Sequence, residues 1–339
     1  MAPRALILGC AATALGSEER SFFRDADPWG FILFKRNVES PEQVRAITAA
    51  LRETVGRADA PILIDQEGGR VQRMGPPHWP AYPPGRAFGR LGTEDALVAR
   101  AVAWLGARLI AHDLRAVGIT VDCLPVLDVP VSGAHDIIGD RAYGDDPRTV
   151  SIFGRAAAEG LLAGGVLPVI KHMPGHGRAA ADSHEQLPVV EASREELEAH
   201  DFPPFQALAD MPLAMTAHVV YAAIDALNPA TTSRRVMAEV IRGHLGYDGL
   251  VTSDDLSMKA LSGGFRERAE ASFAAGCDVA LHCNGRIEEM RPVAEAAPAL
   301  AGDALRRANA ALGRLRHAPE PFDPAEARAR LEAELAAIG

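Results

Sequence analysis

The sequence is poor in several features that would point to particular classes of protein. Only 5% of its 339 residues are aromatic, and the only lysines are Lys35, Lys171 and Lys259. The net charge is −10, and the sequence contains no cluster of basic residues. The positively charged face that a nucleic-acid partner requires is therefore not expected. No apolar stretch is long enough to span a membrane, so we expect no membrane partner either.

Cysteine is also scarce. The four cysteines, Cys10, Cys123, Cys277 and Cys283, form no Cys-x-x-Cys pair, which favours reduced, buried thiols in a reducing compartment. The apolar run before Cys10 superficially resembles a lipoprotein cleavage box, but its length of about five residues is below the ~7–15 of a signal-peptide core. We therefore expect a first buried strand here, in a cytoplasmic protein.

The chain is rich in short apolar runs that alternate with longer helical patterns, and 48% of its residues are hydrophobic. Continuous apolar runs are typical of parallel strands that are buried on both faces. The eight predicted strands are Ala5–Cys10, Gly30–Lys35, Pro61–Asp65, Thr120–Leu127, Leu167–His172, Leu213–Val219, Gly249–Ser253 and Val279–Cys283. The predicted helices between them include Pro41–Val55, Glu94–Val117, Arg148–Ala163, Arg194–Ala209 and Arg266–Gly276, with Ser40 and Ser193 as N-caps.

Eight βα units in series favour an α/β fold of the closed (β/α)8 TIM-barrel type over an open sheet. The length suits one such domain. We expect a catalytic barrel over residues 1–318 and a helical tail over residues 319–339 that packs outside it. Chemistry in these barrels lies where strands end and βα loops begin, so polar residues at strand ends are the candidates for function.

Two polar segments follow the third and fourth predicted strands. In Asp65–Arg73, a carboxylate can accept hydrogen bonds from hydroxyl groups and Arg73 can donate a fork of them. A polar turn with solvated charges is the alternative for this segment. Gly139–Pro147, which contains Arg141, has by itself the character of a turn followed by a helix start.

The fifth predicted strand runs into the densest polar cluster of the chain, Lys171–Gly177 followed by Asp182–His184. Its glycines and proline predict a loop. In an extended segment Asp182 and His184 project to the same side, so the carboxylate can hold one imidazole nitrogen while the other transfers a proton. An exposed polar loop is the alternative.

The last three predicted strands end in single polar groups. His218 follows the sixth strand, and a structural role is as compatible with its position as a functional one. Asp254 and Asp255 close the seventh strand, where alternation aims only one of them at the barrel mouth and leaves the other to cap a helix. A carboxylate at the mouth is a candidate nucleophile or metal ligand. The eighth strand ends at His282–Gly285, which has the composition of a turn.

Together these segments resemble glycoside hydrolase family 3, and in particular its short β-N-acetylglucosaminidases. Lys171–Gly177 with Asp182–His184 resembles the family signature, and Asp254–Met258 resembles its nucleophile segment. Asp65–Arg73, Gly139–Pro147 and Thr216–His218 fit in the same order. The resemblance covers nearly the whole predicted barrel.

The resemblance implies a retaining exo-β-N-acetylglucosaminidase that trims peptidoglycan-derived muropeptides during cell-wall recycling in the cytoplasm. It implies a monomer that acts on a small-molecule sugar and needs no metal or organic cofactor. By position, Asp254 is the nucleophile and His184 is the general acid/base, paired with Asp182. The residues that hold the sugar are then Asp65, Arg73, Arg141, Lys171 and His172.

The implied chemistry has a physical basis. Glycoside cleavage passes through an oxocarbenium-like state, so one group stabilises the anomeric centre and another protonates the leaving oxygen. Both are usually carboxylates, and a histidine acid is an exception. An unperturbed histidine pKa of ~6.5 nevertheless suits proton transfer near neutral pH.

Other classes of function stay open on the sequence. One is a metal-dependent barrel hydrolase, since imidazoles at strand ends suit zinc. Its ligands would be His172, His176, His218 and Asp254. A non-catalytic sugar-binding protein on the same fold is a second, against which the presence of both Asp254 and His184 argues. A Schiff-base lyase that uses Lys171 is a third.

Overall fold

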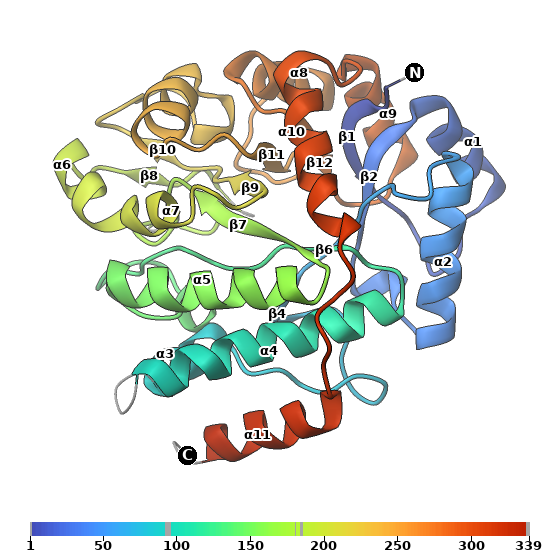
Figure 1. Cartoon of the computed structure of the whole chain (residues 1–339). Coiled ribbons are helices and arrows are strands. Elements are labelled where there is room, and N and C mark those ends of the chain that lie inside the picture. The colour runs from blue at the N-terminus through green and yellow to red at the C-terminus, as the bar shows by residue number, and fades with distance from the viewer. Residues whose placement is uncertain (1, 92–95, 180, 184–185, 337–339) are drawn as a thin grey trace.

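The computed structural model describes residues 2–91, 96–179, 181–183 and 186–336. Eight parallel strands form a closed barrel in the order β1-β12-β11-β9-β7-β6-β3-β2 (Figure 1). Each predicted strand overlaps one of them, so the predicted (β/α)8 barrel is confirmed. The strands are β1 (Arg4–Gly9), β2 (Pro28–Leu33), β3 (Ile62–Ile64), β6 (Val121–Asp122), β7 (Leu167–Met173), β9 (Leu213–Thr216), β11 (Leu250–Asp255) and β12 (Val279–His282).

Helices surround the barrel. They are α1 (Ser17–Ala26), α2 (Pro41–Thr54), α3 (Gly85–Leu91), α4 (Ala96–Ala116), α5 (Pro147–Ala163), α6 (Arg194–Glu196), α7 (Pro203–Ala207), α8 (Phe265–Ala275), α9 (Ile287–Ala296), α10 (Gly302–Gly313) and α11 (Pro324–Ala336). Short 3-10 or π turns are η1 (Lys35–Asn37), η2 (Gly139–Arg141), η3 (Leu197–Asp201), η4 (Ala230–Thr232), η5 (Val236–His244) and η6 (Arg314–Arg316). Both predicted N-caps are confirmed, since the hydroxyl groups of Ser40 and Ser193 accept from backbone N–H groups at 3.2 Å.

The structure departs from the prediction at two prolines. The predicted helix 194–209 is divided into α6, η3 and α7, because Pro203 has no N–H to donate to the preceding turn. The predicted strand 120–127 pairs only over Val121–Asp122 and through a single bridge from Val126 to Lys171, since Pro125 lacks a ladder donor. The predicted helix start at Glu94 lies outside the described residues.

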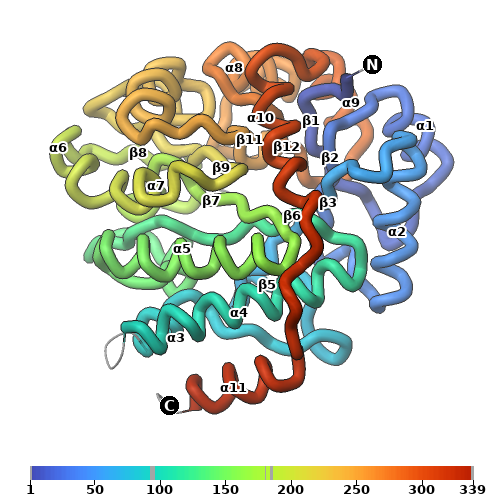
Figure 2. The backbone as a smooth tube through the Cα atoms, viewed as in Figure 1, coloured from blue at the N-terminus to red at the C-terminus, as the bar shows by residue number. Residues whose placement is uncertain are grey.

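Side chains along the strands alternate between the barrel interior and the surrounding helices. In β1, Ala5 and Ile7 belong to the interior cluster, whereas Leu6 and Leu8 pack with the helices. Helix α10 lies across the amino-terminal ends of the strands (Figure 2), and its Ala308 belongs to this interior cluster. That end of the barrel is therefore closed, and the carboxyl ends of the strands face the opposite side.

The C-terminal helix α11 lies against α3 and α4, with Ala327 and Leu331 buried (Figure 2). The segment that leads to it is held by Arg108, whose guanidinium lies 4.1 Å from the centre of the Phe322 ring. These contacts attach the residues after 318 to the outside of the barrel.

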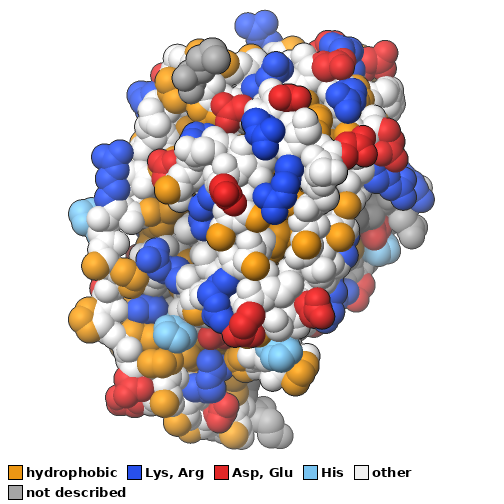
Figure 3. Space-filling model, turned by 90° about the vertical axis from the view of Figure 1, so that its right-hand side faces the viewer, with side chains coloured by type: hydrophobic (Ala, Val, Ile, Leu, Met, Phe, Trp, Pro, Cys, Tyr) orange, Lys and Arg blue, Asp and Glu red, His pale blue; other side chains and the backbone are white. Residues whose placement is uncertain are grey.

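The remaining compositional expectations concern the thiols and the surface. All four cysteines are unpaired and buried, as predicted. Basic and acidic side chains are interspersed on the face shown in Figure 3. Among the helices that the structure describes, none combines the length and apolarity needed to cross a bilayer.

Candidate active site

The chain after β3 folds back at once as a small antiparallel hairpin, β4 (Gln66–Gly68) and β5 (Val71–Gln72). Its turn contains Gly68 and Gly69 at φ values of +94° and +57°, which side-chain-bearing residues rarely adopt. A Cβ atom on Gly68 would also lie 2.2 Å from the carbonyl oxygen of Pro83. The glycine pair therefore allows the hairpin to return over the carboxyl end of the barrel, where it carries acidic and basic side chains.

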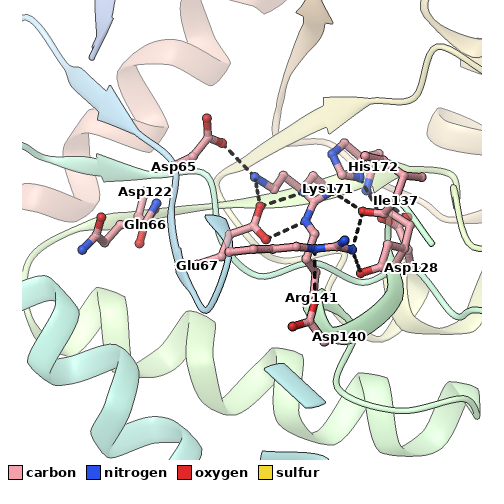
Figure 4. A network of polar contacts seen from close by, with 12 residues as sticks. Asp65, Gln66, Glu67, Asp122, Asp128, Ile137, Asp140, Arg141, Lys171 and His172 are labelled. Atoms are coloured by element: carbon pink, nitrogen blue, oxygen red, sulfur yellow. Dashed lines mark hydrogen bonds and ion pairs between the residues drawn. The ribbon is translucent and has the colours of Figure 1, made fainter. Parts of the chain in front are cut away.

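Two carboxylates and three cations form one network at this end of the barrel, and Figure 4 shows the part of it that joins Asp65, Glu67, Lys171 and Arg141. The Nζ atom of Lys171 lies 2.9 Å from Asp65 Oδ1 and 2.6 Å from Glu67 Oε1. Arg141 donates from Nε and Nη2 to the two oxygens of Glu67, both at 2.8 Å. Arg73 donates from Nη2 to Asp65 Oδ2 at 3.1 Å. Since Lys171 and Glu67 are only 2% and 4% exposed, these charges are stabilised by one another.

The network determines the protonation state of its members. Burial alone would raise the pKa values of Asp65 and Glu67, but their cationic partners lower both, to about 2 for Glu67. Burial alone would lower the pKa of Lys171, but the two carboxylates raise it above its usual value. Lys171 is therefore held as a cation. This argues against the Schiff-base alternative, which needs a neutral amine.

A second polar cluster is built on Asp128, which is fully buried in the loop after β6. Its Oδ2 lies 2.7 Å from Nδ1 of His172, and its Oδ1 accepts the backbone N–H groups of His172 at 3.1 Å and His176 at 2.7 Å. Burial would raise the pKa of Asp128, but His172 and these hydrogen bonds lower it to about 2. Because an ionised carboxylate only accepts, Nδ1 of His172 is the donor.

The loop after β7 continues from this cluster. Nε2 of His176 lies 3.2 Å from the hydroxyl oxygen of Ser183. Burial and the neighbouring His172 lower the pKa of His176 to about 4, so its ring is neutral at pH 7. Asp182 is half-buried beside Ser183, and His184 lies outside the described residues. This contact places Ser183, the residue that precedes the predicted acid/base in the sequence, beside the Asp128 cluster.

Asp254 and Asp255 are both among the residues that line the cavity at the end of β11, where the prediction placed one of them. The pairing register between β11 and β12 shifts after Thr252, which interrupts the alternation. Asp255 caps the turn that follows, not a helix. Its Oδ1 accepts from the N–H groups of Ser257 at 2.9 Å and Cys283 at 3.1 Å, and its Oδ2 accepts the Ser257 hydroxyl at 2.6 Å.

Side chains of the ion-pair network, of the loop after β7 and of the end of β11 line one cavity of about 320 Å³ at the carboxyl end of the barrel. Apolar side chains from the top of the barrel interior, Ile32, Met215 and Leu281, form part of its wall. Ile137 and Ile138 add apolar surface from the loop after β6. Six of the eight predicted site residues line it, namely Asp65, Arg73, Arg141, Lys171, His172 and Asp254.

Several residues of the site were not among the predictions. Glu67 lies inside the predicted polar segment, and its role depends on partners far away in sequence, Lys171 and Arg141. Asp128 directly follows the predicted strand 120–127, the same position relative to a strand that singled out Asp254. That signal was present in the sequence.

The histidines of the metal-hydrolase alternative have other partners. Both ring nitrogens of His218 are engaged, Nδ1 with Thr231 Oγ1 at 2.7 Å and Nε2 with the carbonyl oxygen of Asp255 at 3.0 Å. His172 and His176 belong to the Asp128 cluster. Within the described ranges, no three His, Cys, Asp or Glu side chains are arranged to hold a metal ion. This geometry favours the sugar-site interpretation over the metal hydrolase.

Comparison with known proteins agrees with this geometry. The chain matches the glycosyl hydrolase family 3 N terminal domain over residues 10–314. It is 41% identical to a beta-hexosaminidase of Alkalilimnicola ehrlichii over 323 residues, which cover 94% of this chain and 85% of the relative. Two solved structures of NagZ from Neisseria gonorrhoeae, one in complex with N-trifluoroacetyl-D-glucosamine and one with zinc ion, are both 31% identical to it. The first superposes with a TM-score of 0.88 over 99% of each chain, and the second with 0.83 over 100% of this chain and 98% of the other.

The match to the family spans most of the barrel, and six of the residues for which the resemblance implied a role, Asp65, Arg73, Arg141, Lys171, His172 and Asp254, line its cavity. The chain therefore belongs to glycosyl hydrolase family 3, as its motifs indicated, and it is a glycoside hydrolase.

Proposed function

We propose that the protein is a retaining exo-β-N-acetylglucosaminidase that removes terminal β-linked GlcNAc from peptidoglycan-derived muropeptides such as GlcNAc-anhydroMurNAc. The observation that carries this proposal is the position of Asp254, a strand-end carboxylate that shares one cavity with Lys171, His172 and Arg73. The names of the relatives, beta-hexosaminidase and a NagZ bound to an N-acylated glucosamine, support the choice of sugar.

In this proposal two groups perform the chemistry. Asp254 attacks the anomeric carbon and forms a glycosyl–enzyme ester, while the leaving oxygen takes a proton from His184. Water then attacks the same carbon, gives a proton back to His184 and releases Asp254 as a carboxylate. Asp182, paired with the His184 ring, orients that imidazole. Two displacements at one carbon retain its configuration.

The sugar is held in this proposal by Asp65, Arg73, Arg141, Lys171 and His172. Hydroxyl groups both donate and accept, and these residues supply two acceptors, the Asp65 carboxylate and Nε2 of His172, and several donors. The charges of Asp65, Arg73, Arg141 and Lys171 are already paired before a ligand enters. The site is thus preorganised, and little of the binding free energy is spent on reorganising it.

The proposal also covers the location, the oligomeric state and the cofactor requirement of the enzyme. We propose a cytoplasmic monomer that serves cell-wall recycling, acts on a small sugar and binds no nucleic acid. We also propose that it needs no metal or organic cofactor, because protonation and nucleophilic attack are both assigned to side chains. The zinc ion of the gonococcal structure is a property of that protein.

Stereochemistry tests the mechanism most directly. Proton NMR of the earliest product from an aryl β-N-acetylglucosaminide should show the β-anomer before mutarotation. The α-anomer as first product would overturn the two-displacement mechanism.

Product analysis tests the substrate. Purified GlcNAc-anhydroMurNAc, with and without its peptide, should release free GlcNAc at rates comparable to those of simple β-GlcNAc glycosides. Hydrolysis of the aryl glycoside with no release from the muropeptide fragments would retain the β-N-acetylglucosaminidase activity and reject the muropeptide role.

A further inference from the structure

We propose that Asp128 is a positioning residue of the sugar site, which holds the His172 imidazole so that Nε2 is the nitrogen offered to the ligand. The proposal rests on the proposed function, because it is His172 that contacts the sugar there. Asp128 itself acts only through this ring and its backbone.

The contacts of Asp128 show how this carboxylate can hold the imidazole ring of His172 in one orientation. The carboxylate is 0% exposed, so its contacts with the protein determine its orientation. One oxygen, Oδ2, is 2.7 Å from Nδ1 of His172. The other, Oδ1, accepts the backbone N–H groups of His172 and His176. The same carboxylate therefore fixes both the ring of His172 and the backbone that carries it (Figure 4).

An imidazole held in this way has one remaining nitrogen. Because the ionised carboxylate takes the Nδ1 hydrogen, Nε2 is the atom that can contact a ligand, and His172 lines the cavity. A carboxylate that orients a functional imidazole through Nδ1 is a recurring arrangement in metal sites and in nucleophilic catalysis. Here the oriented ring lines the same cavity as Lys171 and Arg141.

The substitution Asp128→Asn isolates this role. An asparagine has the same shape, and its Oδ1 can still accept both backbone N–H groups. Its Nδ2 then presents a donor to Nδ1 of His172, so that nitrogen must accept and the ring hydrogen is left on Nε2. The change inverts the hydrogen-bonding character of the nitrogen that the ligand meets and removes no backbone contact.

A matched control exists at the other end of the barrel. Asp278 is also buried, and its Oδ2 accepts the N–H of Val251 at 2.9 Å and an Arg242 donor at 2.7 Å. Asp278→Asn makes the same chemical change in a carboxylate with a backbone partner, far from the cavity. It separates a general loss of stability from an effect on the sugar site.

The experiment has a binding arm and a spectroscopic arm. We expect Asp128→Asn to raise the inhibition constant of free N-acetylglucosamine by about 10- to 100-fold, by analogy with the loss seen when the carboxylate that orients a metal-binding histidine is replaced. Asp278→Asn should leave that constant within about twofold. In the His172→Gln background, Asp128→Asn should add little, since its effect passes through the ring.

The spectroscopic arm uses the ¹⁵N–¹H correlations of the histidine rings at pH 7.5, with His172→Gln to assign the signal. The wild-type ring should carry its hydrogen on Nδ1, and Asp128→Asn should shift it to Nε2. An unprotonated Nδ1 in the wild-type enzyme would overturn the proposal even if the variant failed to fold. So would an unchanged inhibition constant, or an equal loss in the His172→Gln background.

Failure of the proposed function gives a different result. If the wild-type enzyme neither cleaves β-GlcNAc glycosides nor binds GlcNAc, the sugar assignment is wrong. The tautomer measurement would still report whether Asp128 orients His172.

Discussion

The two ends of the barrel use the same interaction for different purposes. At the amino-terminal end, Asp278 pairs with Arg242 at 2.7 Å and with Arg307 of α10 at 2.9 Å. At the carboxyl end, Asp65 pairs with Lys171 at 2.9 Å and with Arg73 at 3.1 Å. In both places one mostly buried carboxylate meets two cations.

The two clusters differ in what covers them. Helix α10 lies across the amino-terminal cluster, and its own Arg307 completes it, so the charges there join elements together. The carboxyl-terminal cluster lines a cavity, so the same pairing leaves charged groups within reach of a ligand. A buried ion pair is therefore not evidence of function by itself. Its position relative to a cavity decides, and substitutions at the two ends should separate the two roles.

The largest expected effect concerns the nucleophile. Asp254→Asn removes the attacking carboxylate, so we expect kcat on an aryl β-N-acetylglucosaminide to fall by on the order of 10⁴-fold or more, with the fold intact by circular dichroism. Asp255→Asn is the matched control. It should lose less activity and more thermal stability, because Asp255 holds Ser257 and Cys283 in place. The opposite order of activities would reject Asp254 as nucleophile.

The next effect concerns the proton donor. His184→Ala should slow the first step for substrates with poor leaving groups by ~10²–10⁴-fold, the usual value of general acid catalysis. An activated aryl leaving group needs little protonation and should be affected far less. Pre-steady-state rates across a series of aryl leaving groups measure this difference.

Asp182→Asn should show a weaker form of the same pattern, because that residue orients the ring and does not transfer the proton. A loss by the same factor on good and poor leaving groups would show that His184 only binds or positions the sugar. The acid would then have to be another group of the cavity.

A smaller effect distinguishes the ends of the barrel by stability. Glu67→Gln leaves Lys171 and Arg141 without their shared counter-charge, and breaking a buried pair typically costs about 3–5 kcal/mol. Asp278→Asn should cost a comparable amount. Urea unfolding at pH 7 measures both. Only Glu67→Gln should also raise KM, and an equal KM effect from Asp278→Asn would contradict the comparison.

The dependence of stability on pH provides an internal control for the effect of Glu67→Gln. Its pKa is lowered in the folded protein, so its contribution to stability is present above the unfolded value of ~4.3 and is lost as the pH falls through about 2. The stability difference between wild-type protein and Glu67→Gln should therefore be largest near neutral pH and shrink in acid. A difference that stays constant down to pH 2 would assign it to packing.

The smallest expected effect is the response to chelators. Dialysis against EDTA should leave kcat and KM within about twofold, since no described group of three potential ligands is arranged around a metal. Activity that is lost in EDTA and restored by zinc would revive the metal-dependent hydrolase.

Much of the fold and part of the site could be predicted from the sequence, for a definite reason. Strand ends are local features, and in a (β/α)8 barrel they converge on one face, so Lys171, His172 and Asp254 were identified individually. Their partners were not, because pairings such as Lys171 with Asp65 join residues 106 positions apart. The resemblance to the family implied a sugar-binding role for Asp65 but did not indicate its ion pairs.

Local irregularities were the other limit. Strand alternation assumes regular pairing, whereas the register between β11 and β12 shifts after Thr252, and both Asp254 and Asp255 are among the residues that line the cavity. The register between β7 and β9 shifts in the same way after Ile170, and the neighbours Lys171 and His172 both line the cavity as well. Bulges depend on pairing with the neighbouring strand, so they cannot be predicted from the alternation of residues within one strand.

The closed amino-terminal end of the barrel has a consequence for how polymeric or oligomeric substrates are handled. The interior below the cavity is filled by strand side chains, and Ala308 of α10 packs against them, so among the described residues no open passage leads through the barrel. A saccharide cannot thread through it, and the cleaved sugar must leave by the path it entered. We therefore expect distributive action, in which each turnover ends with full dissociation and intermediates of every length accumulate, in contrast to processive enzymes with open-ended tunnels.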